Sequence, residues 1–175
     1  WSEMFDTCVS NTGTIETSLV DRQEFGLPPT AELFSPEDVV ALTAKTKGSM
    51  QFEDSLGVCR FNTRTNMKLL VAAVRAATGW DLTFEEAMEM GRRTVNLMRA
   101  FNLRHGISAD KDRPSPRYGS TPVNGPAKGV SILPHWDKMV HDYYEQMGWD
   151  GDSGKPLPET LQRLGLGHTV ADIWR

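Results

Sequence analysis

Apolar residues recur at helical spacing along most of this chain, and this pattern limits the folds that it can adopt. In the segment 136–147 the apolar positions fit the i, i+3, i+4, i+7 spacing of a helix with one buried face. These positions are Trp136, Met139, Val140, Tyr143, Tyr144 and Met147. No segment of useful length alternates apolar and polar residues as a half-buried strand does. The sequence therefore predicts an all-α fold, a compact multi-helix domain.

Two further segments are predicted to be helical from the residues at their ends. The run Ser35–Asp38 (SPED) offers an N-cap hydroxyl, a proline in the first turn and early acidic side chains. Another helix is predicted from about Asn66 to Ala77, with Gly79 as its stop. Its apolar residues occupy nearly all sides, which favours a buried central helix.

A longer helix is predicted to follow Thr83. Thr83 and Glu86 match a capping box, in which the two side chains satisfy each other's free backbone N–H groups. One apolar face then follows: Phe84, Ala87, Met88, Gly91, Val95 and Met98. Gly106 marks the end of this helix. A last short helix is predicted from Pro158 to Gly165, and the tail beyond it is predicted to be mobile.

Residues 107–132 interrupt the helical pattern. Prolines and glycines throughout this stretch exclude regular structure: Pro114, Pro116, Gly119, Pro122, Gly125, Pro126 and Gly129. A loop of this length in a compact domain is usually functional or wraps over a partner. We expect it to be ordered by packing, with Tyr118 and Val123 as its anchors.

Composition restricts the cellular location and the classes of binding partner that we expect. The net charge of −4 argues against a nucleic-acid partner, because phosphate binding needs a clustered basic surface. No apolar run approaches the ~20 residues of a membrane span. The chain has only two cysteines and no secretory signal pattern at its start, so we expect a cytoplasmic location. It opens with Trp1, and we expect it to be one part of a longer protein.

The hexapeptide Asp54–Cys59 (DSLGVC) carries the groups best suited to chemistry. A carboxylate such as that of Asp54 accepts paired hydrogen bonds from a donor-rich heterocycle such as a pterin. Gly57 lets the backbone approach a ligand closely. The thiolate of Cys59 is the type of ligand that iron–sulfur clusters require. Such a hexapeptide also arises by chance, and a lone cysteine is more often a small buried apolar residue.

Together with five other segments, this hexapeptide resembles the aldehyde:ferredoxin oxidoreductase family. The hexapeptide is similar to the D-x-x-G-L-C motif of the family, with Val58 in place of the usual leucine. The other segments follow in the family's order, at 77–83 (ATGWDLT), 96–106 (NLMRAFNLRHG), 125–129 (GPAKG), 143–150 (YYEQMGWD) and 158–166 (PETLQRLGL). The resemblance covers about residues 49–166.

The resemblance implies the cofactor-binding, C-terminal domain of a tungsten-pterin, iron–sulfur oxidoreductase. Such an enzyme oxidises aldehydes to carboxylic acids with ferredoxin as the electron acceptor. By this match, Asp54, Gly57 and Val58 would contact tungstopterin, and Cys59 would be a ligand of a [4Fe–4S] cluster. The implied partners are the remaining N-terminal and middle domains, ferredoxin or another electron-transfer protein, and a small aldehyde. Two alternatives stay open: a ring-reducing enzyme of the benzoyl-CoA reductase type, and a cofactor-free helical interaction module.

We expect residues 1–175 to form a single helical domain. In this division, about 1–34 form an irregular lead-in, 35–106 the cofactor-side helices, 107–132 the long loop and 133–175 the C-terminal helices.

The catalytic acid or base is not identified by the sequence. Residues 8–16 lie where members of the family place active-site residues, and some of these have a histidine there. This chain has no histidine before His105, so Glu16 is the remaining candidate for the acid or base. A glutamate in such a position more often has a structural role. Cys8 is expected to be a packing residue. Four arginines are expected to be partly solvated and to bond helix ends and loop carbonyls: Arg92, Arg93, Arg99 and Arg104.

Overall fold

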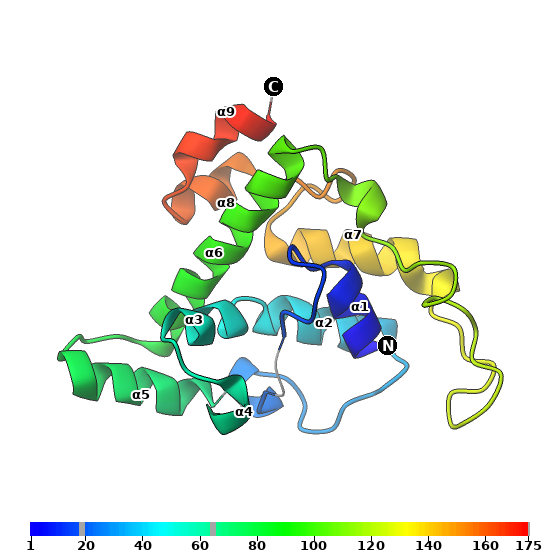
Figure 1. Ribbon diagram of the computed structural model, residues 1–175, viewed down its shortest axis with the longest axis horizontal. Coiled ribbons are helices and arrows are strands. Elements are labelled where there is room, and N and C mark those ends of the chain that lie inside the picture. Colours follow the sequence, from blue (N-terminus) through cyan, green and yellow to red (C-terminus); the bar gives the residue numbers. More distant parts are fainter. Residues whose placement is uncertain (18–19, 64–65, 175) are drawn as a thin grey trace.

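The computed structural model describes residues 1–17, 20–63 and 66–174, which form an all-helical domain (Figure 1). Its α-helices are α1 (Ser2–Cys8), α2 (Pro36–Thr46), α3 (Ser49–Ser55), α4 (Arg60–Thr63), α5 (Met67–Thr78), α6 (Phe84–Arg104), α7 (Trp136–Met147), α8 (Pro158–Arg163) and α9 (Val170–Ile173). Short 3-10 turns lie at η1 (Arg22–Phe25), η2 (Ala109–Lys111), η3 (Leu133–His135) and η4 (Gly167–Thr169). Within the described residues there is no strand, and the all-α prediction is confirmed. No helix of this described part is long and apolar enough to cross a membrane.

Helix α6 is the element around which the domain is organised. Near its start, Ala87 and Met88 join the apolar cluster that also contains residues of α3 and α5. In its middle, Val95 joins the cluster of α1, α2 and α7. Near its end, Ala100 packs with α8 and α9. Successive stretches of α6 therefore contribute to three small cores. Of the predicted apolar face, Ala87, Met88, Gly91 and Val95 are buried, whereas Ala100 meets the third core from another side of the helix.

The predicted helix ends are also confirmed. The Asp38 N–H donates to Ser35 Oγ at 3.2 Å at the start of α2. At the start of α6, the Glu86 N–H donates to Thr83 Oγ1 at 3.1 Å and the Thr83 N–H donates to Glu86 Oε2 at 2.8 Å. Gly148, in the left-handed conformation, ends α7.

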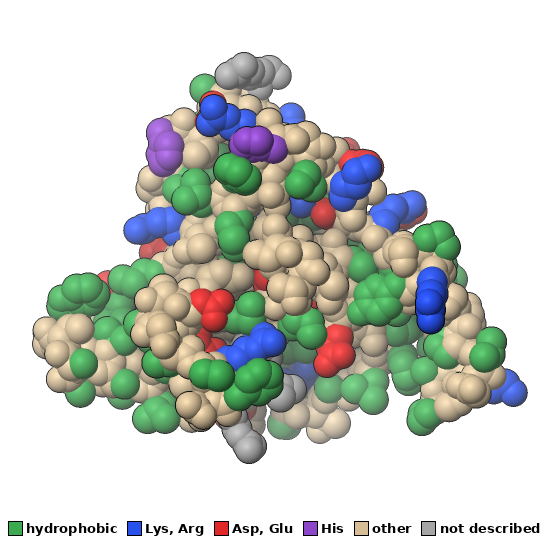
Figure 2. Space-filling model, viewed as in Figure 1, with side chains coloured by type: hydrophobic (Ala, Val, Ile, Leu, Met, Phe, Trp, Pro, Cys, Tyr) green, Lys and Arg blue, Asp and Glu red, His purple; other side chains and the backbone are tan. Residues whose placement is uncertain are grey.

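Helix α5 is not the buried central helix that its composition favours. Its buried residues are Met67, Leu70 and Val71, whereas Leu69 is 61% exposed. The helix lies at the edge of the domain, where apolar side chains are visible on the surface (Figures 1 and 2). Much of its apolar character comes from exposed alanines, namely Ala72, Ala73, Ala76 and Ala77. Alanine is the best helix former, so this segment reflects helix propensity rather than burial.

The two ends of the chain are more regular than predicted. Helix α1 lies inside the predicted irregular lead-in, and the ring of its Phe5 packs edge-on against Trp136 of α7, with 5.4 Å between ring centroids. Helix α9 lies in the predicted mobile tail, where Ile173 is buried and the Trp174 indole donates to the Pro156 carbonyl at 2.8 Å. The prediction of a mobile tail is therefore wrong. Both helices are too short to show a clear apolar period, and tertiary packing stabilises them.

The loop 107–132 is held near its ends and not by the predicted anchors. Tyr118 is 44% exposed and Val123 is 81% exposed, so the prediction that they anchor the loop is wrong. Asp112 and Ile132 are buried instead. Figure 1 shows the stretch between them extending away from the helices before it returns to α7.

Gly91 allows α6 to cross the α2–α3 junction in backbone contact. A Cβ atom at position 91 would lie 2.6 Å from the carbonyl carbon of Gly48, which is closer than such atoms approach. We expect Gly91→Ala to lower the free energy of unfolding by about 1–3 kcal/mol, because backbone must shift to admit the methyl group. Urea denaturation of the 175-residue chain measures this change. Thr94→Ala, at an exposed site on the same helix, is the control and should change it by less than about 0.5 kcal/mol. Equal midpoints for the two variants would contradict the close crossing.

Candidate functional site

The hexapeptide Asp54–Cys59 forms the end of α3 and the turn into α4. Gly57 has a φ of +69°, a left-handed conformation that suits glycine and ends α3. No atom lies within 4 Å of the place where a Cβ of Gly57 would be. The carbonyl of Cys59 accepts the Asn62 N–H at 2.8 Å and so begins α4. Gly57 thus forms the turn between the end of α3, which carries the Asp54 carboxylate, and the start of α4, which the Cys59 thiol precedes.

This turn is buried on one side and open on the other. Phe52 and the half-buried Leu56 pack into the apolar cluster of α3, α5 and the start of α6, and so anchor the helix. The predicted site residues, by contrast, are all exposed: Asp54, Gly57, Val58 and Cys59. The structure therefore leaves all four residues of this short turn accessible to a group held by another part of the protein.

The exposed turn fits part of a pterin and cluster site. Its carboxylate, its open glycine and its free thiol are the expected donor types. Among the described residues, no group of three or more His, Cys, Asp or Glu side chains could hold a metal ion. Because a [4Fe–4S] cluster normally takes four protein ligands, the other ligands would come from outside these residues.

Cys8, the other cysteine, lies in α1 and packs against the cluster of α1, α2 and α7. Burial first, and then the charge of Asp112, raise the pKa of the Cys8 thiol to about 11. At neutral pH this side chain is therefore a protonated thiol, which is a poor nucleophile and a poor metal ligand. Its surroundings agree with the packing role predicted from the sequence.

Glu16 belongs to a buried ion cluster with Asp6 and Lys47, here called the Lys47 cluster. The Lys47 Nζ lies 2.6 Å from Asp6 Oδ1 and 3.3 Å from Glu16 Oε2, and none of the three side chains is more than 1% exposed. Burial opposes the charge of Lys47, but the neighbouring Tyr143, Asp6 and Glu16 outweigh it, so the pKa of Lys47 is raised above its ordinary value. The enclosed carboxylate of Glu16 has no open side for a substrate, which favours a structural role over a catalytic one.

Sequence reasoning missed the Lys47 cluster. Its members are separated by 10 and 31 positions along the chain, so no spacing pattern marks them. Lys47 directly follows α2, and a basic residue is common at a helix C-terminus, so its position in the sequence does not indicate that it is buried.

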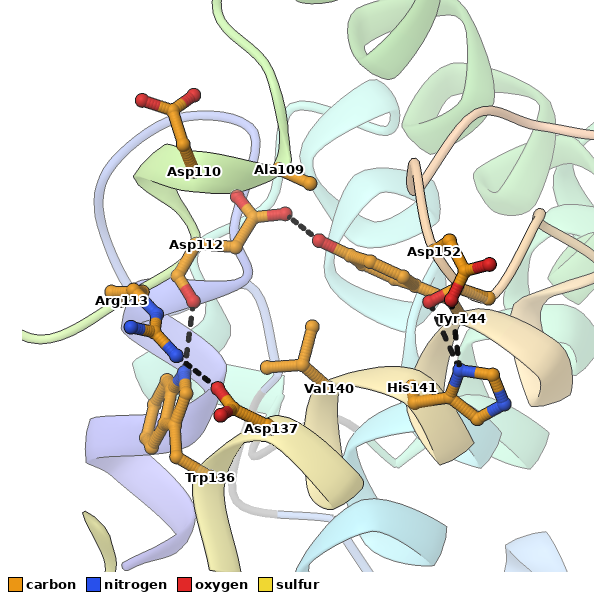
Figure 3. A pocket seen from close by; sticks show the side chains of 11 residues that line it. Ala109, Asp110, Asp112, Arg113, Trp136, Asp137, Val140, His141, Tyr144 and Asp152 are labelled. Atoms are coloured by element: carbon orange, nitrogen blue, oxygen red, sulfur yellow. Dashed lines mark hydrogen bonds and ion pairs between the residues drawn. The ribbon is translucent and has the colours of Figure 1, made fainter.

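A pocket of about 340 Å³ lies elsewhere, between η2, α7 and the turn after α7 (Figure 3). Several of its polar groups are engaged with one another: Tyr144 donates to the Asp112 carboxylate, the Trp136 indole donates to the Asp112 carbonyl at 3.0 Å, and Arg113 pairs with Asp137. No residue of the hexapeptide lines this pocket, so it is not part of the candidate site.

Two of the four arginines of α6, Arg92 and Arg93, bond carbonyls at helix ends as predicted, whereas the exposed Arg104 pairs with a carboxylate of α9 instead. Arg92 donates to a carbonyl near the end of α2, and Arg93 donates to the carbonyl that caps α8, at 3.2 and 2.8 Å. Arg99, however, is only 1% exposed and pairs with Asp112 at 2.8 Å. The prediction that Arg99 is partly solvated is wrong, because its partner comes from the loop 107–132.

Comparison with known proteins identifies the family of this chain. The family described as "Aldehyde ferredoxin oxidoreductase, domains 2 & 3" matches residues 5–166. A tungsten-containing aldehyde ferredoxin oxidoreductase of Pyrococcus furiosus is 35% identical over 116 residues, which cover 65% of this chain and 19% of that protein. The protein of the same name from Thermococcus kodakarensis is 33% identical over 116 residues, with the same coverage of 65% and 19%. An aliphatic sulfonate oxidoreductase, WOR-like subunit, of Pyrococcus furiosus is 31% identical over 134 residues, which cover 71% of this chain and 21% of that protein.

The chain spans about a fifth of the length of the curated relatives it matches. The family match includes the exposed hexapeptide and runs from α1 through α8. It therefore covers most of the helical fold as well as the candidate site. On this evidence, the chain belongs to the aldehyde ferredoxin oxidoreductase family.

Proposed function

We propose that this chain is the C-terminal, cofactor-binding domain of a tungsten-pterin, iron–sulfur enzyme that oxidises aldehydes to carboxylic acids. The observation that carries the proposal is the exposed turn Asp54–Cys59, which presents a carboxylate, an open glycine and a thiol together. The names of the matched relatives support tungsten and aldehyde oxidation. Ferredoxin is the proposed electron acceptor, a small aldehyde is the proposed substrate, and the proposed location is cytoplasmic.

Each residue of the turn has a proposed role. Asp54 accepts hydrogen bonds from pterin N–H groups, and Gly57 allows the ligand to approach the backbone. Val58 contacts the pterin, and the thiolate of Cys59 is one cluster ligand. When bound, tungstopterin and the [4Fe–4S] cluster supply the oxidation chemistry and the electron transfer. The protein contributes binding, orientation and the exclusion of water.

Metal content separates this proposal from its alternatives. We expect the full-length protein to contain tungsten and iron in elemental analysis, and to oxidise aldehydes with reduction of ferredoxin. Metal-free protein would contradict the proposal and favour a cofactor-free interaction module. Metal-loaded protein that reduces an aromatic ring of a CoA thioester, and does not oxidise aldehydes, would favour the benzoyl-CoA reductase type.

Asp54→Asn is expected to weaken retention of the pterin. The change replaces a charged acceptor by a neutral one, and hydrogen bonds to charged groups contribute about 1.5–3 kcal/mol. Retention should therefore fall by about tenfold or more. Tungsten remaining after extensive dialysis of the full-length variant measures the effect. Asp152→Asn makes the same chemical change at a fully exposed carboxylate and serves as the control. Equal tungsten content in both variants would contradict a pterin role for Asp54.

A further inference from the structure

We propose that a row of exposed apolar side chains on α6 is the surface on which another part of the same polypeptide, outside residues 1–175, docks. The row consists of Met90, Leu97 and Phe101 and is here called the α6 row. This inference rests on the proposed function, in which the chain is one domain of a longer enzyme. It concerns a side of α6 that the three cores of the described residues leave uncovered.

The members of the α6 row share one side of the helix. They are seven and four positions apart in the sequence, so at about 100° per residue they lie within about 40° of one another. Thr94, which is uncharged, lies between Met90 and Leu97 on the same side. In chain order, the three apolar residues are 40%, 45% and 61% exposed. In Figure 2, hydrophobic side chains lie at the surface over the course of α6.

This row gives α6 a second apolar side. The helix already packs into the cores of the domain through residues such as Val95. Among the described residues, no member of the α6 row belongs to these cores, although the ring of Phe101 packs on that of His105 with 4.2 Å between ring centroids. Single exposed apolar residues are ordinary, whereas a continuous apolar surface marks an interface. A helix that is apolar on several sides is typical of one that is covered on several sides.

A pocket continues the α6 row at its first residue. Met90 lines this pocket together with Trp80, Leu82 and several charged residues, and the volume is about 340 Å³. Trp80 is 61% exposed, so its large aromatic ring is available to a partner. Side chains that fill such pockets contribute much of the binding energy at interfaces. The pocket therefore offers a place for one bulky side chain of the docked segment.

The size of this surface favours an occupant in the same polypeptide over a second copy of the chain. A stable complex of separate proteins needs about 800 Å² and about 20–30 residues on each side. The α6 row and the pocket beside it offer far fewer residues. A covalently linked segment has a high local concentration, so a small surface is enough to hold it. The relatives have room for such a segment, because this chain spans 19% and 21% of the length of two of them.

Photo-cross-linking of the full-length protein tests the proposal. The photoreactive residue p-benzoylphenylalanine, which contains a phenylalanine side chain, is introduced at position 101. On irradiation we expect a product of monomer size, in which mass spectrometry finds position 101 linked to a peptide outside residues 1–175. The control carries the same residue at position 138 of α7. The side chain of Lys138 is 72% exposed and pairs with Asp142, so this position should stay in water and give no such link.

Three other outcomes would overturn the proposal. A product of dimer size would assign the α6 row to self-association. A link to a residue within 1–175 would show that the domain covers its own row, and the absence of any product at position 101 would leave the row in water. The tungsten and iron content of the same sample keeps the two proposals apart. Metal-free protein with the expected link would overturn the proposed function and leave the docking surface standing.

A second measurement needs no cross-link. In the full-length protein, Leu97→Asp should raise the rate of limited proteolysis by about tenfold or more, because an unpaired charge opposes the docking of an apolar segment. Leu97→Met keeps an apolar side chain of similar volume and should be cleaved at the parent rate. Leu97 lies outside the three cores, so the aspartate should leave the fold of the domain itself intact. Cleavage of Leu97→Asp at the parent rate would contradict docking at the α6 row.

Discussion

Replacement of Arg99 by alanine is expected to lower the free energy of unfolding of the domain by about 3–5 kcal/mol, because it leaves the buried Asp112 carboxylate without a cation. Asp112 is 4% exposed and Arg99 is 1% exposed, so neither charge is compensated by water. Arg99 Nη2 lies 2.8 Å from Asp112 Oδ2, and Nη1 donates to Oδ1 at 3.2 Å. Loss of this pair alone is a large fraction of the stability of an ordinary domain.

The guanidinium also joins elements that are distant in the sequence. Arg99 Nε donates to the Gly154 carbonyl at 2.9 Å, in the turn after α7. The group lies over the Tyr144 ring at 5.4 Å and over the Trp149 ring at 5.0 Å from the ring centroids. Alanine would therefore remove packing and cation–π contacts in addition to the ion pair. The loop 107–132 should loosen together with α7.

Urea denaturation of the 175-residue chain, followed by circular dichroism, measures the effect. Arg104→Ala is the control, because Arg104 is 64% exposed and its pair with Asp172 is long, at 3.4 Å. A surface pair of this kind contributes about 0–1 kcal/mol. The double variant Arg99→Met with Asp112→Leu should lose less stability than Arg99→Ala, since no charge is left unpaired. Equal losses in Arg99→Ala and Arg104→Ala would contradict the buried pair.

Local patterns predicted those parts of the fold that depend on local interactions. Helices α6 and α7 are long enough to show an apolar period, and a capping box or a glycine stop marks their ends. Helix α1 has seven residues, so the contact of Phe5 with α7 stabilises it, and that contact is not visible in the sequence. The alanines of α5 led to a wrong prediction of burial. Alanine is both apolar and the best helix former, so an alanine-rich exposed helix has a composition similar to that of a buried helix.

The same distinction applies to the candidate site. The hexapeptide Asp54–Cys59 is continuous in the sequence, so its resemblance to a family motif was enough to select it as a candidate, and the structure shows its predicted site residues exposed. The Lys47 cluster and the pair Arg99–Asp112 join residues that are far apart in the chain. Nothing local at Lys47 or Arg99 separates a buried, paired cation from an ordinary solvated one. Only the folded arrangement brings their carboxylates to them.

The proposed function predicts that Cys59→Ala in the full-length protein damages the proposed iron–sulfur cluster while the fold stays intact. Cys59 is exposed, so its loss removes no core packing. A [4Fe–4S] cluster normally has four protein ligands, and loss of one thiolate should lower the iron content or change the EPR spectrum of the reduced protein. Electron transfer to ferredoxin should fall with it. Circular dichroism and the urea midpoint should stay close to those of the parent.

Cys8→Ala is the matched control for Cys59→Ala, because it removes the other free thiol of the chain. The raised pKa of Cys8, about 11, keeps that thiol protonated at neutral pH, so its loss should leave iron content and EPR unchanged. Because Cys8 packs in the core of α1, α2 and α7, its replacement should reduce stability instead. The two cysteines are therefore expected to give opposite results, iron loss at Cys59 and stability loss at Cys8. Unchanged iron stoichiometry and an unchanged EPR spectrum in Cys59→Ala would remove Cys59 from the cluster, and the exposed turn would then need another explanation for its thiol.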